Sequence, residues 1–176
     1  MKNMPINNES ETSFLTRNEM DSIEAWISIM RIDPLSIPKE KMKLAQRTLE
    51  LPYRIIGNGL NRMVYDLGNG YVLKIALSGL GLISNTQEFN LYHTSHPDIQ
   101  KYLCQVMEKG QGWIVMKKMD RRVSLNLVNL QKLSKLTMKF LLRGIVPVDL
   151  RLSNIALSDD NQLVVIDYRF FTTPLN

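Results

Sequence analysis

One lysine of this chain lies inside an apolar segment, where an unpaired ammonium group is costly. Lys74 belongs to the run Val72–Ala76, and a charge buried in such a run needs an anionic partner. Glu88, near the start of the next predicted helix, is the candidate for that partner. On its own the pair is also compatible with a purely structural ion pair.

Two acids and an amide follow in the last part of the chain. Asp149 stands five positions before Asn154, and Asp167 ends the apolar run Val164–Ile166. Carboxylate and amide oxygens are the ligands that Mg²⁺ prefers. Combined with a buried lysine, they predict an apparatus for magnesium and phosphate. Taken singly, the two acids could be a turn residue and a strand-end cap.

A glycine-containing turn precedes the lysine. Gly57 and Gly59 open a Gly-x-Gly-x-x-Arg-x-Val stretch that continues to Arg62 and Val64. It is not a dinucleotide fingerprint, because Arg62 stands at the third glycine and the next predicted element is a strand. It is not a lysine-terminated phosphate loop either, because no Gly-Lys-Ser/Thr follows. What remains is a hairpin whose bare backbone could approach phosphates, or an ordinary turn.

Taken in order, these residues resemble the motifs of protein-kinase-like phosphotransferases of the small bacterial or phage type, over roughly residues 52–170. The resemblance implies that Gly57 and Gly59 belong to the glycine-rich loop and that Val64 covers the adenine. It implies that Lys74 contacts the α and β phosphates of ATP and that Glu88 is its ion-pair partner on helix C.

The same resemblance assigns the remaining site residues. The segment from Met116 through Lys117 to Met119 would read the adenine edge with its backbone. Asp149 would be the catalytic base, and Arg151 would steady the transferred phosphate. Asn154 and Asp167 would hold Mg²⁺. The implied cofactors are therefore ATP and Mg²⁺.

The sequence also departs from the family pattern. Pro147 and Val148 stand where His-Arg usually precedes the catalytic acid, and Tyr168 and Arg169 replace Phe-Gly after the metal-binding acid. The activation segment and later helices of the family are not present in the 176 residues, so we expect a reduced C-lobe. The apolar face of the helix at 125–142 then needs a cover. Residues 1–50, a second copy of the chain or another protein could supply it.

The spacing of apolar residues predicts where the helices and strands lie. Helices are predicted from Asn18 to Met30 and from Pro38 to Leu49. Short strands, hairpin turns and two further helices follow. The expected strands are 53–56, 62–67, 71–77, 103–108, 113–118, 154–157 and 163–166, and the expected helices are 85–94 and 125–142. This predicts an α+β, protein-kinase-like fold with an antiparallel N-lobe sheet, helix C and a minimal C-lobe.

Three regions follow from this reading: a helical N-terminal extension (1–50), a kinase-like N-lobe (51–119) and a reduced C-lobe (120–176) with the catalytic loop and the metal-binding Asp. A single cysteine among 176 residues argues against internal disulfides and zinc sites. No leader-like start or apolar membrane span is seen, so we expect a cytoplasmic protein, in the host cytoplasm if viral.

The net charge of +5 favours an anionic partner such as a nucleotide. A basic stripe of Lys132, Lys135, Lys139 and Arg143 could meet nucleic acid, but no aromatic residues interleave to stack bases, so nucleic acid is not the favoured partner. The leading hypothesis is transfer of the γ-phosphoryl of ATP to a hydroxyl on a partner protein or on the chain itself. The alternative is a noncatalytic, pseudokinase-like module that binds and regulates another protein.

Overall fold

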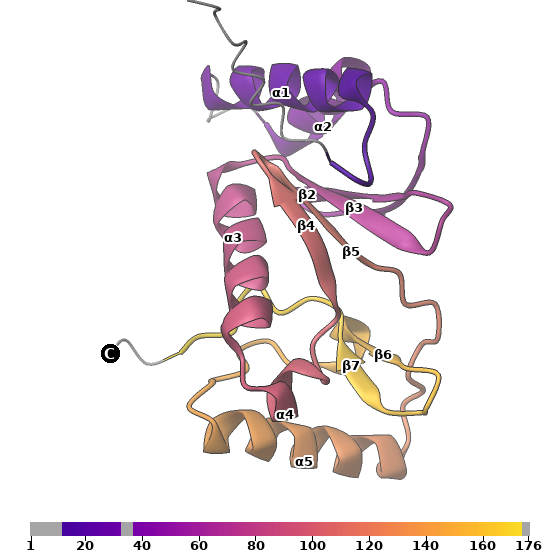
Figure 1. The fold of residues 1–176 in the computed structure, drawn as a ribbon, viewed down its shortest axis with the longest axis vertical. Helices are drawn as coiled ribbons and strands as arrows, with labels where there is room; N and C mark the ends of the chain where they lie inside the picture. Colours follow the sequence, from indigo (N-terminus) through magenta and orange to yellow (C-terminus); the bar gives the residue numbers. More distant parts are fainter. Residues whose placement is uncertain (1–11, 33–36, 174–176) are drawn as a thin grey trace, which may run out of the picture.

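The computed structural model describes residues 12–32 and 37–173, arranged as a sheet between helices with a smaller C-terminal half below it (Figure 1). Residues 1–11 of the predicted extension and its break at 33–36 lie outside this range. The first elements are α1 (Arg17–Ile32), α2 (Pro38–Leu49), β1 (Arg54–Asn58), β2 (Arg62–Asp66), β3 (Tyr71–Ala76), α3 (Gly79–Thr94) and α4 (Pro97–Gln100). The later ones are β4 (Val106–Gly110), β5 (Trp113–Lys117), α5 (Leu127–Leu142), a 3₁₀ turn (Leu152–Asn154), β6 (Ile155–Leu157) and β7 (Leu163–Val165).

The main sheet has five antiparallel strands, and its antiparallel character was predicted. Their order is β1-β2-β3-β5-β4. The lysine-bearing strand β3 is therefore central, with β2 and β5 as its neighbours. Its hairpin with β2 contains Gly68 and Gly70 at φ of 75° and 89°, a region that glycine enters without steric cost.

Side-chain alternation divides the sheet between two cores. On β3, Leu73 and Ile75 face the core shared with α1 and α2, while Val72 faces the other core. Because successive side chains of a strand point to opposite faces, Lys74 lies on the same face as Val72. That face is the one packed against α3 and the C-terminal half.

The N-terminal helices pack on the face of the sheet away from Lys74. Trp26 of α1 is 1% exposed, and its indole N–H donates to the carbonyl of Ala76 at 2.8 Å. Gly112 lies directly under Ile27 at φ +88°, so a side chain there would collide with α1. The described helices of the extension are therefore part of the sheet's core. They do not cover the helix at 125–142, one of the roles suggested for the extension, because α1 and α2 lie at the end of the molecule opposite α5 (Figure 1).

The C-terminal half is joined to the sheet by backbone pairing. Leu103 forms a parallel bridge with Val165 of β7, and the N–H of Cys104 donates to the Val165 carbonyl at 2.8 Å. The segment predicted as one strand, 103–108, thus pairs with two different strands. Its first residues pair with β7, and the strand β4, which pairs with β5, begins only at Val106.

Helix α5 buries one side and exposes the other. Leu136 and Phe140 are in the core, whereas Leu127 and Leu142 are 78% and 79% exposed. The expectation that this helix carries uncovered apolar surface is consistent with those values. Within the described ranges, no helix has the length and apolar character needed to cross a membrane.

Candidate functional site

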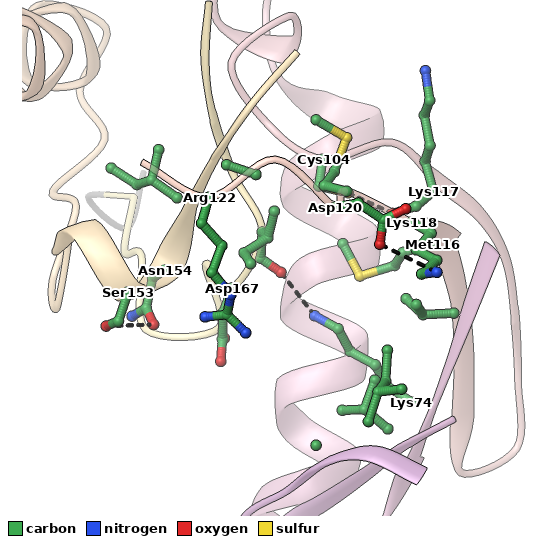
Figure 2. A pocket seen from close by; sticks show the side chains of 18 of the residues that line it. Lys74, Cys104, Met116, Lys117, Lys118, Asp120, Arg122, Ser153, Asn154 and Asp167 are labelled. Carbon is green, nitrogen blue, oxygen red and sulfur yellow. Dashed lines mark hydrogen bonds and ion pairs between the residues drawn. The ribbon is translucent and has the colours of Figure 1, made fainter. Parts of the chain in front are cut away.

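A cleft of about 780 Å³ opens between the main sheet and the C-terminal half. Its sheet side includes Gly57, Gly59 and Val64 of the predicted glycine loop, together with Lys74. Asn154 and Asp167 line the opposite side. Figure 2 shows Lys74 reaching toward the segment that carries Asp167, with Asn154 beyond it.

The structure brings the predicted lysine–glutamate pair together. Lys74 Nζ lies 3.2 Å from Glu88 Oε2, and the Glu88 side chain is fully buried. Burial alone would raise the pKa of Glu88, but the charges and hydrogen bonds of Lys74 and Arg62 lower that pKa to about 2. Glu88 is therefore ionised, and it lies beneath the cleft surface, where it pairs with Lys74 and Arg62.

Arg62 is a site residue that the sequence did not reveal. Its Nη1 lies 2.6 Å from Glu88 Oε2, and its Nη2 lies 3.1 Å from Asp167 Oδ1. Burial alone would lower the pKa of Arg62, but the two carboxylates raise it, so the guanidinium stays charged. The motif placed an arginine where a glycine was expected, and that substitution was the available signal.

Three bonds hold the segment 166–168 against the sheet and α3. Lys74 Nζ donates to the carbonyl of Ile166 at 2.9 Å, and Arg62 pairs with Asp167. The N–H of Tyr168 donates to Glu88 Oε1 at 3.1 Å. Asp167 is thus fixed at the junction of the two halves of the molecule.

The predicted catalytic acid lies next to the cleft, outside its lining. Asp149 has φ of 62°, which is uncommon for a residue with a side chain and is found more often at functional sites. Its carbonyl and its carboxylate accept hydrogen bonds from the amide of Asn154 at 3.0 and 3.3 Å. Arg151 Nη2 lies 3.3 Å from Asp149 Oδ2 and does not line the cleft either.

The predicted adenine-reading segment does line the cleft. Met116 is fully buried at its back, and Lys117 and Met119 lie along its edge. The backbone N–H groups of Lys117 and Lys118 donate to carbonyls of Gln105 and Gly70. Those two N–H groups are therefore engaged within the protein.

Cationic side chains dominate the cleft. Two acidic side chains line it, Asp120 and Asp167, against seven basic ones: Arg54, Arg62, Lys74, Lys117, Lys118, Arg122 and Arg169. Such an excess of positive charge in a concave surface attracts and retains polyanions. A nucleoside triphosphate has the charge that this lining complements.

Asn154 and Asp167 have the oxygen donors that suit Mg²⁺. The Asn154 amide nitrogen donates to Asp149, and its Oδ1, which accepts a hydrogen bond from the Ser153 hydroxyl at 3.4 Å, is the atom that would contact a cation. These oxygen atoms are thus of the kind that binds a magnesium ion, although the Asp167 carboxylate is already paired with Arg62. Residues 12–32 and 37–173 contain no group of three His, Cys, Asp or Glu side chains that could hold a metal by themselves.

The basic stripe on α5 is partly engaged within the chain. Lys139 Nζ donates to the Tyr102 hydroxyl at 2.9 Å, and Arg143 Nη2 lies 2.7 Å from Asp98 Oδ2. Two of its four cations thus already have intramolecular partners.

No family model matches this sequence, and no curated protein matches it. Solved structures do match. The crystal structure of WbdD superposes with a TM-score of 0.54 at 18% identity, over 71% of this chain and 34% of that one. WbdD is described as a bifunctional kinase-methyltransferase.

A second WbdD structure, with the kinase inhibitor LY294002, gives a TM-score of 0.55 at 14% identity over 86% of this chain and 59% of that one. The Rio2 kinase–ADP/Mg²⁺–phosphoaspartate complex from Chaetomium thermophilum gives 0.51 at 18% identity, over 68% and 48%. The chain thus spans between about a third and three fifths of these matched structures. By its sheet, its helices and these neighbours, this chain has a protein-kinase-like fold.

Proposed function

We propose that this protein binds Mg-ATP in the cleft and transfers the γ-phosphoryl group to a hydroxyl, on a partner protein or on itself. The observation that carries the proposal is the position of Lys74. Its ammonium is held by Glu88 on one side and by the carbonyl next to Asp167 on the other. A cation fixed at the floor of a basic cleft is suited to contact phosphate oxygens.

The sheet side of the cleft supplies the nucleotide contacts in this proposal. The backbone around Gly57 and Gly59 lies over the phosphates, and Val64 and Met116 pack against the adenine. Because the N–H groups of Lys117 and Lys118 are engaged, we assign the adenine edge to the backbone of Met119.

The C-terminal side supplies the transfer chemistry. Asp149 orients the acceptor hydroxyl and takes its proton, and Arg151 steadies the transferred group. Asn154 and Asp167 hold Mg²⁺, which neutralises phosphate charge when bound. The position of Asp149 at the rim suits an acceptor that enters from outside the cleft.

Two measurements on the same variants test this function. Thermal shift with Mg-ATP reports binding, and incorporation of label from radiolabelled ATP reports transfer. We expect Lys74→Met to lose the shift, and Asp149→Asn to keep the shift while losing label by about 10²–10⁴-fold. Lys135→Met, an equivalent change on exposed α5, is expected to retain both. Absence of any shift at millimolar ATP contradicts the proposal.

The alternative, a noncatalytic module, has one observation in its favour. Both acids have cationic partners here, Asp149 with Arg151 and Asp167 with Arg62. A shift without label, whatever hydroxyl acceptor is supplied, would identify a nucleotide-binding regulator instead of a transferase.

We propose further that the protein is of the small bacterial or phage type and acts in the cytoplasm. The exposed apolar side of α5, including Leu127 and Leu142, is where we expect a protein partner or a second copy of the chain. Replacing both leucines by lysine should abolish that association in light-scattering measurements without a loss of nucleotide binding.

A further inference from the structure

Arg62 occupies a position in the cleft that is both buried and electrostatically central. Its side chain is 4% exposed, and it lines the cleft from β2. Besides Glu88 and Asp167, its guanidinium contacts the amide oxygen of Asn85 at 3.4 Å. It therefore links β2, α3 and the segment after β7 at a single point.

The charges around Asp167 do not favour a divalent cation in the arrangement observed. Arg62 Nη2 and Arg169 Nε lie 3.1 and 3.7 Å from Asp167 Oδ1. With Lys74 and Glu88 included, three positive and two negative side chains meet here. Without the two arginines, the same cluster would carry one net negative charge. The arginines thus already neutralise the carboxylate that a metal ion would otherwise neutralise.

One donor of Arg62 lacks an acceptor within the described part of the chain. Among the described residues none accepts a hydrogen bond from Arg62 Nε, although this atom is buried. A buried donor without an acceptor is costly, and charged donors cost more than neutral ones. Arg62 lines the cleft, so a small turn of its guanidinium would bring this donor to a phosphate oxygen bound there; guanidinium groups bind phosphate with several parallel hydrogen bonds.

We propose that Arg62 is a phosphate-binding residue and that this cleft does not need a divalent cation to bind nucleoside triphosphates, so that it binds ATP and Mg-ATP alike. The inference rests on the proposed nucleotide binding, and it names the protein side chains whose positive charges face the phosphates. Arg62 and Lys74 would contact the phosphates at the binding step. In the arrangement observed, Arg62 occupies the Asp167 carboxylate that would hold Mg²⁺, so this binding step does not draw on the metal.

The test is the dissociation constant of ATP for the full chain, measured by calorimetry in millimolar MgCl₂ and again in excess EDTA. We expect the two constants to agree within about threefold. Binding in MgCl₂ alone would overturn the inference and leave the proposed function intact. Binding in neither condition would overturn both.

Variants of Arg62 assign the effect to this residue. Arg62→Gln is expected to weaken binding in EDTA by about tenfold or more, and to make the affinity depend on Mg²⁺. Arg62→Lys keeps the charge and should lose less, which provides a folded variant if Arg62→Gln is unstable. Arg47→Gln, the same change at an exposed position on α2, is the matched control. Unchanged metal-free binding in Arg62→Gln, or in Arg62→Lys if the glutamine variant does not fold, would refute the role of Arg62.

Discussion

Replacing Gly81 by alanine tests how closely α3, the helix that carries Glu88, must lie against the sheet. A Cβ at this position would collide with the carbonyl oxygen of Asn61 and lie 3.1 Å from the Cα and Cβ of Ala76. The Asn61 carbonyl also accepts the N–H of Leu77 at 2.8 Å, so it is fixed in place. Because the obstructing atoms belong mainly to backbone, α3 itself must shift.

The size of the effect follows from two opposing contributions. Overpacking costs about 1–3 kcal/mol, and alanine recovers at most about 1 kcal/mol of helix propensity over glycine. A collision with backbone places the cost at the upper end, so we expect a net loss of about 2 kcal/mol. In a chain of this size that lowers the melting temperature by about 4–8 °C.

Gly79→Ala is the control in the same turn of the same helix, because its Cβ would meet nothing within 4 Å. Circular dichroism should place its melting temperature at that of the parent chain or up to about 4 °C above it, since alanine has the better helix propensity and meets no obstacle. The thermal shift with ATP should fall for Gly81→Ala, since moving α3 moves Glu88 away from Lys74. Equal melting temperatures for the two variants would refute the close packing of α3 against the sheet.

Three further predictions concern buried groups. Burial raises the pKa of Cys104 to about 12, so iodoacetamide at pH 8 should modify this thiol only after unfolding; mass-spectrometric labelling of the native chain would contradict this. Trp26→Phe leaves the carbonyl of Ala76 without its indole donor, and the free energy of unfolding in urea should fall by about 1–3 kcal/mol; an unchanged value would mean that the bond is dispensable. The pKa of Glu88 is lowered from 4.5 to about 2, so its ionised form contributes about 3 kcal/mol of stability above pH 4.5 that is lost as the pH falls through 2. Unfolding of Glu88→Gln should therefore depend less on pH in that window, and an identical pH dependence would refute the assignment.

Local patterns were enough to predict the sheet. Alternating apolar residues and the turn at Asn69-Gly70 define β2 and β3, and they place Lys74 in a strand without reference to the rest of the chain. The pairing with Glu88 was also predicted, because a buried lysine requires a nearby anion and few acids are close in sequence.

The start of α3 was predicted six residues too late, at Asn85 instead of Gly79. Gly79 and Gly81 have poor helix propensity, but Ser78 caps the helix by accepting from the N–H of Gly81 at 3.2 Å. Glycine at position 81 leaves room for the carbonyl of Asn61, on the loop before β2, where a Cβ would collide. That contact is tertiary, so propensity alone could not predict it.

The contacts of Arg62 could not be predicted from the neighbouring sequence either, because they too are tertiary. Its partner Asp167 is 105 positions away, and only the folded chain brings the two together. The short helix α4 was missed as well, although His96 followed by Pro97 is a recognisable helix start.

The seating of α1 on the sheet has a practical consequence for spectroscopy. Both tryptophans of the chain, Trp26 and Trp113, belong to the core between the N-terminal helices and the sheet. Their emission therefore reports on that interface and is blind to rearrangements around Asp149 that leave it intact. Thermal unfolding followed by tryptophan fluorescence reports on this interface, whereas unfolding followed by far-ultraviolet circular dichroism reports on the secondary structure of the whole chain. A difference between the two midpoint temperatures would show that the two halves lose structure at different temperatures.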